Sequence, residues 1–293
     1  MHPRLPSHLS RSALAGASAL GLIVALGAGT AASASVHPAH GSASARATAL
    51  AFLKHLKIGD HATNHAVMGH ATLSGKAPKQ VTSTNWSGYA DDNTSGTKYS
   101  KLAGKWTEPT GKCGSKTSLA AFWVGIDGYS TGTVEQDGTL IECVSGTPHY
   151  YSWWEMYPSN AIQVVGSSVK PGDKISTSVV KSGTSYTLKV TDSTHTANSF
   201  TKKESCAAGT CTDGSAEWIA EAPSGSSGVY PLTNFGTWSL SGGTVTGSGK
   251  SGTISSFPDD EITMVKSGTS TVEAKPGPLN AAGNAFKVTW KSA

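Results

Sequence analysis

Short apolar segments alternate with turn-forming residues along the chain from about residue 81 onward. Val, Ile, Thr, Tyr and Trp dominate these segments, and Gly, Ser, Asn or Asp separate them; examples are residues 174–183, 187–193, 237–249, 262–268 and 285–292. A spacing of about 8 to 12 residues between such segments is typical of antiparallel strands. No repeat of fixed period is present, which argues against a propeller or a solenoid. The pattern predicts an all-β domain, a two-sheet antiparallel β-sandwich.

Four of the expected strands carry polar groups among apolar or aromatic side chains. Side chains alternate between the two faces of a strand, so every second residue shares a face. The shared faces are Ala121, Trp123, Gly125 and Asp127; Val134 and Gln136, opposite Glu135 and Asp137; Tyr151, Trp153, Glu155 and Tyr157; and Glu217, Ile219 and Glu221. Two carboxylates four residues apart, around a Trp, are unusual in a chain with only 14% charged residues.

The first 80 residues differ in composition from the rest of the chain. Residues 1–34 have a basic start, an apolar run and the small-residue pattern Ala32-Ser33-Ala34, which predict a secretory signal peptide and a secreted protein. Residues 35–80 hold six of the ten His, are basic, and are predicted to be a propeptide; a flexible linker is the alternative. Helical periodicity over residues 48–58 predicts one short amphipathic helix within this segment. Residues 81–293 are expected to form the mature domain.

The charge of the mature domain argues against a nucleic-acid partner. Residues 81–293 hold 16 Lys and Arg against 18 Asp and Glu, so the net charge of +4 for the whole chain comes from the leader and propeptide. Without a basic stripe, a nucleic-acid partner is not expected. No segment is apolar enough for a membrane span, and we expect a monomer.

All four cysteines lie in the predicted mature domain. An even number of Cys in an exported chain indicates disulfides, and four Cys allow three pairings. We favour a local bridge between Cys206 and Cys211, which leaves Cys113 to pair with Cys143. A zinc site is not expected, since the spacings are not those of metal ligands.

Elimination leaves carboxylates and amides as candidate catalytic groups. A Ser–His–Asp triad needs a His base, and the mature domain offers only His149 and His195. The sequence contains no nucleophile elbow, zinc-protease motif, P-loop or dinucleotide fingerprint. No metal or cofactor is therefore expected.

Several segments together resemble the glutamic peptidase family, the eqolisins. They are "FWVGIDG" (122–128), Gln136, "WWEMYP" (153–158), "AEWIAE" (216–221) and "NFGTW" (234–238), and "TNWSGYA" (84–90) resembles the mature N-terminal region of that family. The resemblance runs in order from Thr84 to the C-terminus. It implies a lectin-like (concanavalin A-like) sandwich with the active site on the concave face, a signal peptide and a basic propeptide.

The resemblance also implies roles for individual residues. The catalytic dyad of the family maps to Gln136 and Glu217, and Glu221 matches the second acid of the "EWI" segment. The surrounding site residues map to Trp123, Asp127, Trp153, Glu155 and Tyr157. Asp127 and Glu155 are expected to orient or tune the dyad, and the three aromatic side chains to line the cleft. The "WWEMY" segment departs from the family pattern, which leaves the side-chain preference open.

The expected activity is endopeptidase cleavage of proteins in acid, with peptides as substrates and the propeptide as inhibitor. Glu217 would act as general acid and base on a water molecule, and the Gln136 amide would donate to the oxyanion. Two alternatives share the fold and the aromatic residues. One is a lectin-like carbohydrate-binding module, and the other is a glycoside hydrolase with two carboxylates, such as Glu155 and Glu217.

Overall fold

The fold is described from a computed structural model, which places residues 51–56, 58, 78–92, 96–129, 131–206 and 211–293. The chain divides into two units, Met1–His40 and Gly41–Ala293, and every described residue belongs to the second unit. The predicted signal peptide and most of the predicted propeptide lie outside the described residues. In the described ranges, no helix is long and apolar enough to cross a membrane.

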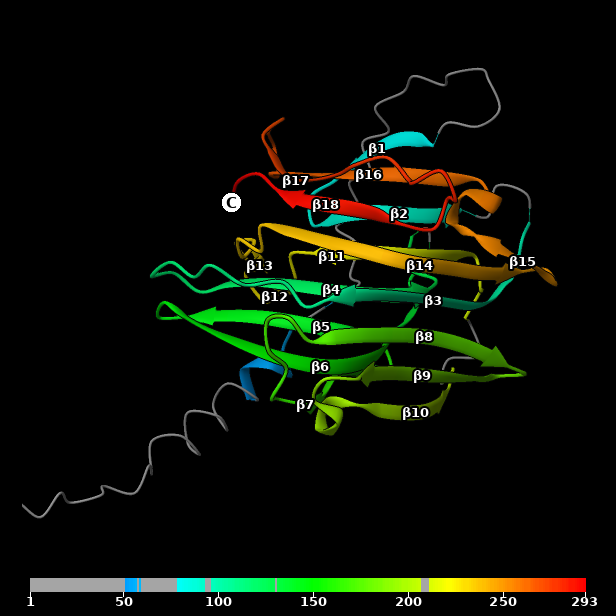
Figure 1. Ribbon diagram of the computed structural model, residues 1–293, viewed down its shortest axis with the longest axis horizontal. Helices are drawn as coiled ribbons and strands as arrows, with labels where there is room; N and C mark the ends of the chain where they lie inside the picture. Colours follow the sequence, from blue (N-terminus) through cyan, green and yellow to red (C-terminus); the bar gives the residue numbers. More distant parts are fainter. Residues whose placement is uncertain (1–50, 57, 59–77, 93–95, 130, 207–210) are drawn as a thin grey trace, which may run out of the picture. The chain divides into compact units, whose positions relative to one another are not determined.

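One continuous path of hydrogen-bonded antiparallel strands makes up most of the second unit. The path folds back on itself between β17 and β16, so that its two halves form the two layers of a sandwich (Figure 1). In spatial order, the first layer contains β10 (Phe200–Ser205), β9 (Ser185–Asp192), β8 (Lys174–Ser182), β3 (Tyr99–Thr107), β14 (Thr237–Gly247), β18 (Phe286–Trp290) and β17 (Val272–Pro276). The second layer contains β16 (Asp259–Val265), β2 (Trp86–Asp92), β11 (Ser215–Glu221), β4 (Ser118–Ile126), β5 (Val134–Val144), β6 (Thr147–Tyr157) and β7 (Asn160–Gly166).

The remaining elements are short. β1 (Lys79–Ser83) pairs with β16 and is parallel to it, while β15 (Lys250–Thr253) pairs with β14. β12 (Ser224–Gly225) and β13 (Gly228–Val229) form a separate hairpin, and η1 (Thr196–Asn198) and η2 (Ile254–Ser256) are single 3-10 turns. β1 begins two residues before the predicted start of the mature domain and extends its sheet.

Successive side chains on the strands of the second layer point to opposite faces, and each face carries its own apolar cluster. Phe122 and Trp218 point between the layers, where the Phe122 ring stacks on Trp238 with centroids 5.4 Å apart. Trp123 and Ile219 are their sequence neighbours and point to the opposite, outer face of the layer, where a second cluster forms. Burial of one large apolar side chain contributes about 1.5–3 kcal/mol. The inner cluster therefore holds the layers together, and the outer cluster is available to a further segment of the chain.

The observed fold confirms the predicted two-sheet β-sandwich. All five apolar segments singled out above contain strands, namely β8, β9, β14, β16 and β18. Both predicted disulfides are present: Cys113–Cys143 links residues 30 apart in sequence, and Cys206–Cys211 closes a loop of five.

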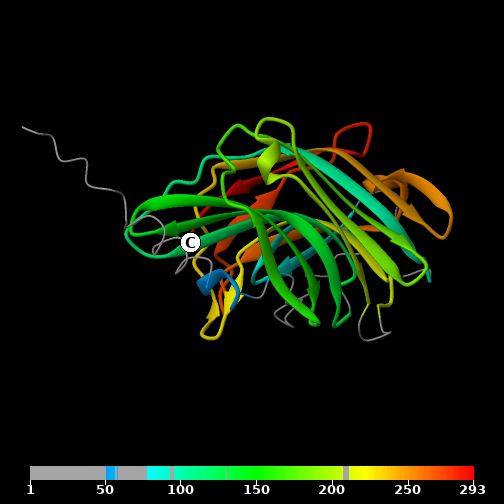
Figure 2. The same ribbon diagram turned by 90° about the horizontal axis from the view of Figure 1, so that it is seen from below.

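Residues 51–56 and 58 pack against the outer cluster. Residues 51–53 are helical, and hydrogen bonds from His55 N to Phe52 O and from Leu56 N to Leu53 O form a turn after them. In Figure 2 this segment, drawn in blue, lies against the strands of the second layer and beside the hairpin β12–β13. Of the predicted amphipathic helix, the structure thus shows one helical turn at residues 51–53, and Leu53, Leu56 and Ile58 are buried against the sheet.

Candidate active site

A row of residues crosses the second layer near the end of β4 and includes both predicted catalytic residues. Gly125 of β4 is in register with Gln136 of β5 on one side and with Glu217 of β11 on the other. Residues in register on neighbouring strands point to the same face of a sheet. Because neighbouring strands lie about 4.8 Å apart, the backbones of Gln136 and Glu217 are separated by about 10 Å.

Gly125 lies between these two residues, and the Trp123 ring packs directly over it. A Cβ atom at this position would lie 2.9 Å from the Trp123 ring and 3.2 Å from Cβ of Gln136. Both distances are tighter than ordinary van der Waals contact, so any side chain here would displace a neighbour. The glycine is therefore needed for the close packing of Trp123 and Gln136 beside the strand.

The Gln136 side chain is fully buried, and both hydrogens of its amide are engaged. Nε2 donates to Glu155 Oε2 at 2.9 Å and to the backbone carbonyl of Ile58 at 2.6 Å. Because the amide group has two N–H donors, a third acceptor cannot be added without displacing one of these. The bond to Glu155, which is in register with Gln136 on β6, orients the amide with its nitrogen toward these two acceptors.

Glu217 is also fully buried, and its carboxyl group receives no hydrogen bond of normal geometry from the described residues. Burial raises the pKa of Glu217 well above its usual value, and the charges of Asp127 and Asp91 raise it further. The Ser215 side chain lowers the pKa of Glu217. In the full chain Glu217 is therefore protonated over a wider pH range than an exposed Glu.

Glu221 lies on the same face of β11 but has different surroundings. Its Oε2 accepts a hydrogen bond from Trp123 Nε1 at 2.8 Å, and its Oε1 lies 3.4 Å from Nδ2 of Asn85. These donors stabilise a fixed position of the carboxylate and occupy lone pairs that a catalytic water would need. The two acids of the "EWIAE" segment are thus distinguished by geometry: Glu221 is held by partners, and Glu217 lies in register with Gly125 without a hydrogen bond of normal geometry from the described residues.

Comparison with known proteins adds an independent observation. Residues 84–276 match the model of the Peptidase A4 family. The chain belongs to this family of glutamic peptidases, the eqolisins. Among curated protein sequences, none matches the chain.

Two solved structures show the same fold as this glutamic peptidase. One is Scytalido-glutamic peptidase with a peptide-based transition state analogue, which is 21% identical with a TM-score of 0.60 and covers 71% of this chain and 98% of its own. The other is SCP-B, an eqolisin in complex with the tripeptide Ala-Ile-His, which is 21% identical with a TM-score of 0.58 and the same two coverages. Membership of a peptidase family favours peptide hydrolysis over the carbohydrate-directed alternatives.

The Asp127 side chain does not lie on the face of β4 where strand alternation predicts it. β4 ends at Ile126, and Asp127 adopts a positive φ of 66°, so strand alternation does not place it beside Trp123 on the outer face. Its carboxylate accepts hydrogen bonds from three backbone amides, of Thr212, Asp213 and Gly214, at 2.6–2.8 Å, and from the Thr212 hydroxyl at 2.7 Å. Asp127 therefore anchors the loop that leads into β11 and contributes to the position of Glu217 indirectly.

The aromatic residues of the predicted site lie on the outer face as expected. Trp123 and Trp153 are fully buried and flank Gly138, with which both are in register. Tyr157 is half-buried and packs against the same cluster. This row lies directly beside the row of Gln136, so that an apolar surface adjoins the candidate dyad.

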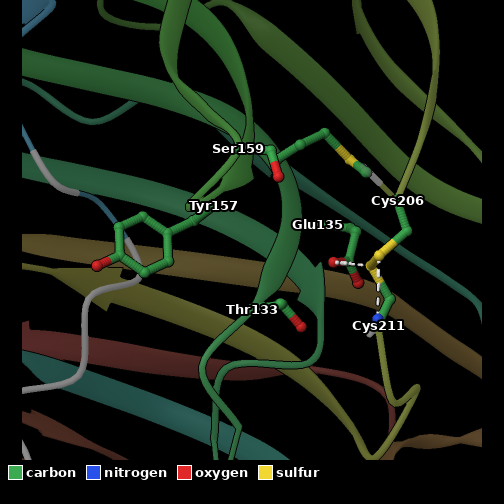
Figure 3. Close-up of a pocket in the computed structure, with 7 residues that line it drawn as sticks. Thr133, Glu135, Tyr157, Ser159, Cys206 and Cys211 are labelled. Carbon is green, nitrogen blue, oxygen red and sulfur yellow. Dashed lines mark hydrogen bonds between the residues drawn. A yellow bond between two sulfur atoms is a disulfide. The ribbon is translucent and has the colours of Figure 1, made fainter. Parts of the chain in front are cut away.

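A small pocket lies at the other face of β5 (Figure 3). Burial raises the pKa of Glu135, which lines this pocket, well above its usual value, with further contributions from Asp127 and Asp213. Its Oε1 is 3.0 Å from Sγ of Cys211. A disulfide sulfur carries no hydrogen, so Cys211 donates no hydrogen bond in this contact. Glu135 thus points away from Gln136, as strand alternation predicts.

One group of residues in the described ranges has the composition of a metal site. Ligand atoms of Asp173, Asp192 and His195 lie within 4.8 Å of one another. Internal hydrogen bonds account for this arrangement: His195 Nδ1 is 2.7 Å from Asp173, and Asp192 accepts from Asn198 Nδ2 at 2.8 Å. The group is remote in sequence from the dyad strands and belongs to the loops around η1.

Sequence reasoning missed three contributors to the site. The sequence assigns Gly125 only to a face, although it lies in register with both dyad residues and its lack of a side chain lets Trp123 pack over the strand. Asn85 was part of a segment matched to the family, but its contact with Glu221 joins residues 136 positions apart. Ile58, whose carbonyl contacts Gln136, lies in the predicted propeptide and carried no sequence signal for a contact with the dyad.

Proposed function

We propose that the protein is a secreted acid endopeptidase that hydrolyses peptide bonds through Gln136 and Glu217. The observation that supports this most directly is the placement of the two residues. They flank Gly125 on one face of the sheet, and the Glu217 carboxyl group receives no hydrogen bond of normal geometry from the described residues. An amide donor and a carboxyl group on either side of one strand suit a water-mediated attack on a carbonyl carbon.

The reaction follows from the chemistry of the two groups. Ionised Glu217 takes a proton from a water molecule, and the water oxygen bonds to the carbonyl carbon of the substrate. The carbonyl oxygen then carries negative charge, and Gln136 Nε2 stabilises it by donating a hydrogen bond. Glu217 returns the proton to the leaving nitrogen as the C–N bond breaks. Glu155 keeps the amide of Gln136 in the donating orientation.

Operation in acid is supported by the carboxyl groups of the domain. Burial raises the pKa of Asp91, Glu135, Asp137 and Glu142 above the usual range. Such groups are neutral in an acidic medium, so the fold does not need to bury their charges there. A domain of this kind loses little stability when the pH falls. At neutral pH the same carboxyl groups are driven toward ionisation, which destabilises the fold.

We further propose that the enzyme is made as a zymogen, with residues 1–34 as signal peptide and residues 35–80 as inhibitory propeptide. Two contacts support the inhibitory role: Ile58 O binds Gln136 Nε2, and Nζ of Lys79 lies 3.8 Å from Asp260. Asp260 is in register with Ala90, which is in register with Glu217. On acidification His residues of the propeptide gain charge while carboxylates lose it, which weakens such ion pairs and favours release.

The test is an assay of protein hydrolysis between about pH 3 and pH 6, a range that spans the usual pKa of Glu. The parent chain and the Glu217→Gln and Gln136→Ala variants are expressed in full and incubated in acid, and their fold is checked by circular dichroism. The proposal expects cleavage of denatured protein by the parent alone. Binding or cleavage of a polysaccharide without proteolysis would instead identify a carbohydrate-directed protein.

A further inference from the structure

Residues 51–58 present an apolar face to the cleft that contains the dyad. Leu53, Leu56 and Ile58 are almost completely buried in the same cluster as Trp123 and Trp153. The ring of Phe52 meets that of Tyr230, next to the hairpin β12–β13, edge to face with centroids 5.6 Å apart. Lys54 and His55 point away from the sheet and are exposed. The segment thus binds through its apolar side chains.

The carbonyl group of Ile58 lies where a substrate carbonyl is required. Its oxygen is 2.6 Å from Nε2 of Gln136, which is short for a hydrogen bond between neutral groups. The other hydrogen of this amide is bound to Glu155. A substrate oxygen can therefore reach the Gln136 amide only after Ile58 has left.

We propose that residues 51–56 and 58 block the substrate cleft, with Ile58 in the position of the residue that precedes the scissile bond. In peptide hydrolysis, the carbonyl group that meets the oxyanion donor belongs to the residue on the amino side of the scissile bond. The pocket that buries the Ile58 side chain is then the pocket for this residue in substrates. The inference rests on the proposed function and adds a preference for bulky aliphatic residues, such as Ile and Leu, at this position.

The surroundings of Gln136 agree with such a preference. The row beside it contains Trp123 and Trp153, both fully buried, with Gly138 between them. Ile219 follows on β11, in register with Trp123. These side chains are apolar apart from the two indole N–H groups, of which that of Trp123 is bound to Glu221. An acidic side chain entering this surface would lose its hydration without gaining a cationic partner.

Bound Ile58 also keeps a substrate carbonyl away from Gln136. Both hydrogens of Nε2 are engaged, one by the Ile58 carbonyl and the other by Glu155. Burial raises the pKa of Glu217, which favours the protonated carboxyl group in the full chain. Occupation by Ile58 thus blocks the oxyanion donor.

The first experiment measures the specificity of acid-incubated parent enzyme. Quenched peptides of one sequence differ only at a single central residue, which is Ile, Leu, Ala or Asp, and mass spectrometry locates the cut. We expect cleavage after Ile or Leu with kcat/KM at least about tenfold above Ala, and no cleavage after Asp. Cleavage of all four peptides at equal rates, or cuts that ignore this residue, would overturn the inference but not the proposed function. No cleavage of any peptide or protein would overturn the proposed function itself.

The second experiment tests the occupancy of the cleft by Ile58. Full-length chains with Ile58→Asp and with the exposed control Lys54→Ala are assayed immediately after acidification, before any processing seen by intact mass. We expect Ile58→Asp to show at least about tenfold more activity than the parent and the control. A synthetic peptide of residues 48–58 should inhibit the processed enzyme, and its Ile58→Asp form should be at least about tenfold weaker. Equal inhibition by the two peptides would contradict the placement of Ile58, even where the chain variant fails to fold.

Discussion

Replacement of Glu108 by Gln should make the domain less sensitive to neutral pH. Glu108 follows β3, is 2% exposed, and accepts hydrogen bonds at Oε2 from Thr139 Oγ1 at 2.7 Å and Trp106 Nε1 at 3.1 Å. Its Oε1 is buried without a partner among the described residues. Burial raises the pKa of Glu108 from 4.5 to about 8, while the two hydrogen bonds oppose the shift.

The sign and size of the effect follow from proton linkage. Between pH 4.5 and about 8 the folded state keeps the proton on Glu108 and the unfolded state does not. Stability therefore falls as pH rises, by about 1.4 kcal/mol per pH unit for this one group. From pH 4.5 to 7 the loss amounts to about 3 kcal/mol. Glu108→Gln keeps an oxygen for Thr139 and Trp106 but does not titrate, so it should escape this loss.

The assay is urea unfolding followed by Trp fluorescence at pH 4, 5, 6 and 7. Both chains carry Glu217→Gln to prevent self-digestion, and Glu204→Gln, which removes a carboxylate of a surface ion pair, is the control. Glu108→Gln should have similar stability to its parent at pH 4 and exceed it by about 3 kcal/mol at pH 7. The control should stay within about 1 kcal/mol of the parent throughout. Parallel pH curves for Glu108→Gln and its parent would refute the reasoning.

Three further substitutions test other parts of the site. Gly125→Ala should lower kcat about 10²-fold, because its Cβ displaces Trp123 or Gln136. Gly132→Ala, whose Cβ would meet nothing within 4 Å, should not lower kcat, and equal rates of the two variants would contradict the role of Gly125. Glu221→Gln should keep activity within about tenfold of the parent, since an amide oxygen still accepts from Trp123; abolished proteolysis would assign the catalytic role to Glu221. Asp127→Ala should destabilise the fold by about 3 kcal/mol or more in urea, with Asn costing less; unchanged stability of the Ala variant would exclude the loop anchor.

The fold could be predicted because its signals are local. Alternation of apolar and polar residues marked β8, β9 and β14, and it placed Gln136, Glu217 and Glu221 on the outer face of their strands. The five-residue separation of Cys206 and Cys211 likewise made their bridge predictable. These features depend on neighbours in sequence, for which strand periodicity and loop closure are sufficient guides.

The roles of Asp127 and Gly125 could not be predicted because they depend on where a strand ends and how strands align. A strand one residue longer would have placed Asp127 in the cleft; instead its positive φ turns it toward the loop before β11. The register of Gly125 with two strands at once is a property of the sheet, not of its own sequence. The contact between Ile58 and Gln136 spans 78 residues and depends on the propeptide as well.

The most direct test of the account is the acid protease assay of the parent chain beside Glu217→Gln and Gln136→Ala. The two residues are predicted to supply the proton transfer and the oxyanion donor from opposite sides of Gly125. Glu217→Gln should retain no measurable proteolysis, and Gln136→Ala should lose about 10² to 10³-fold in kcat. Near-parental activity of either folded variant would contradict the central claim.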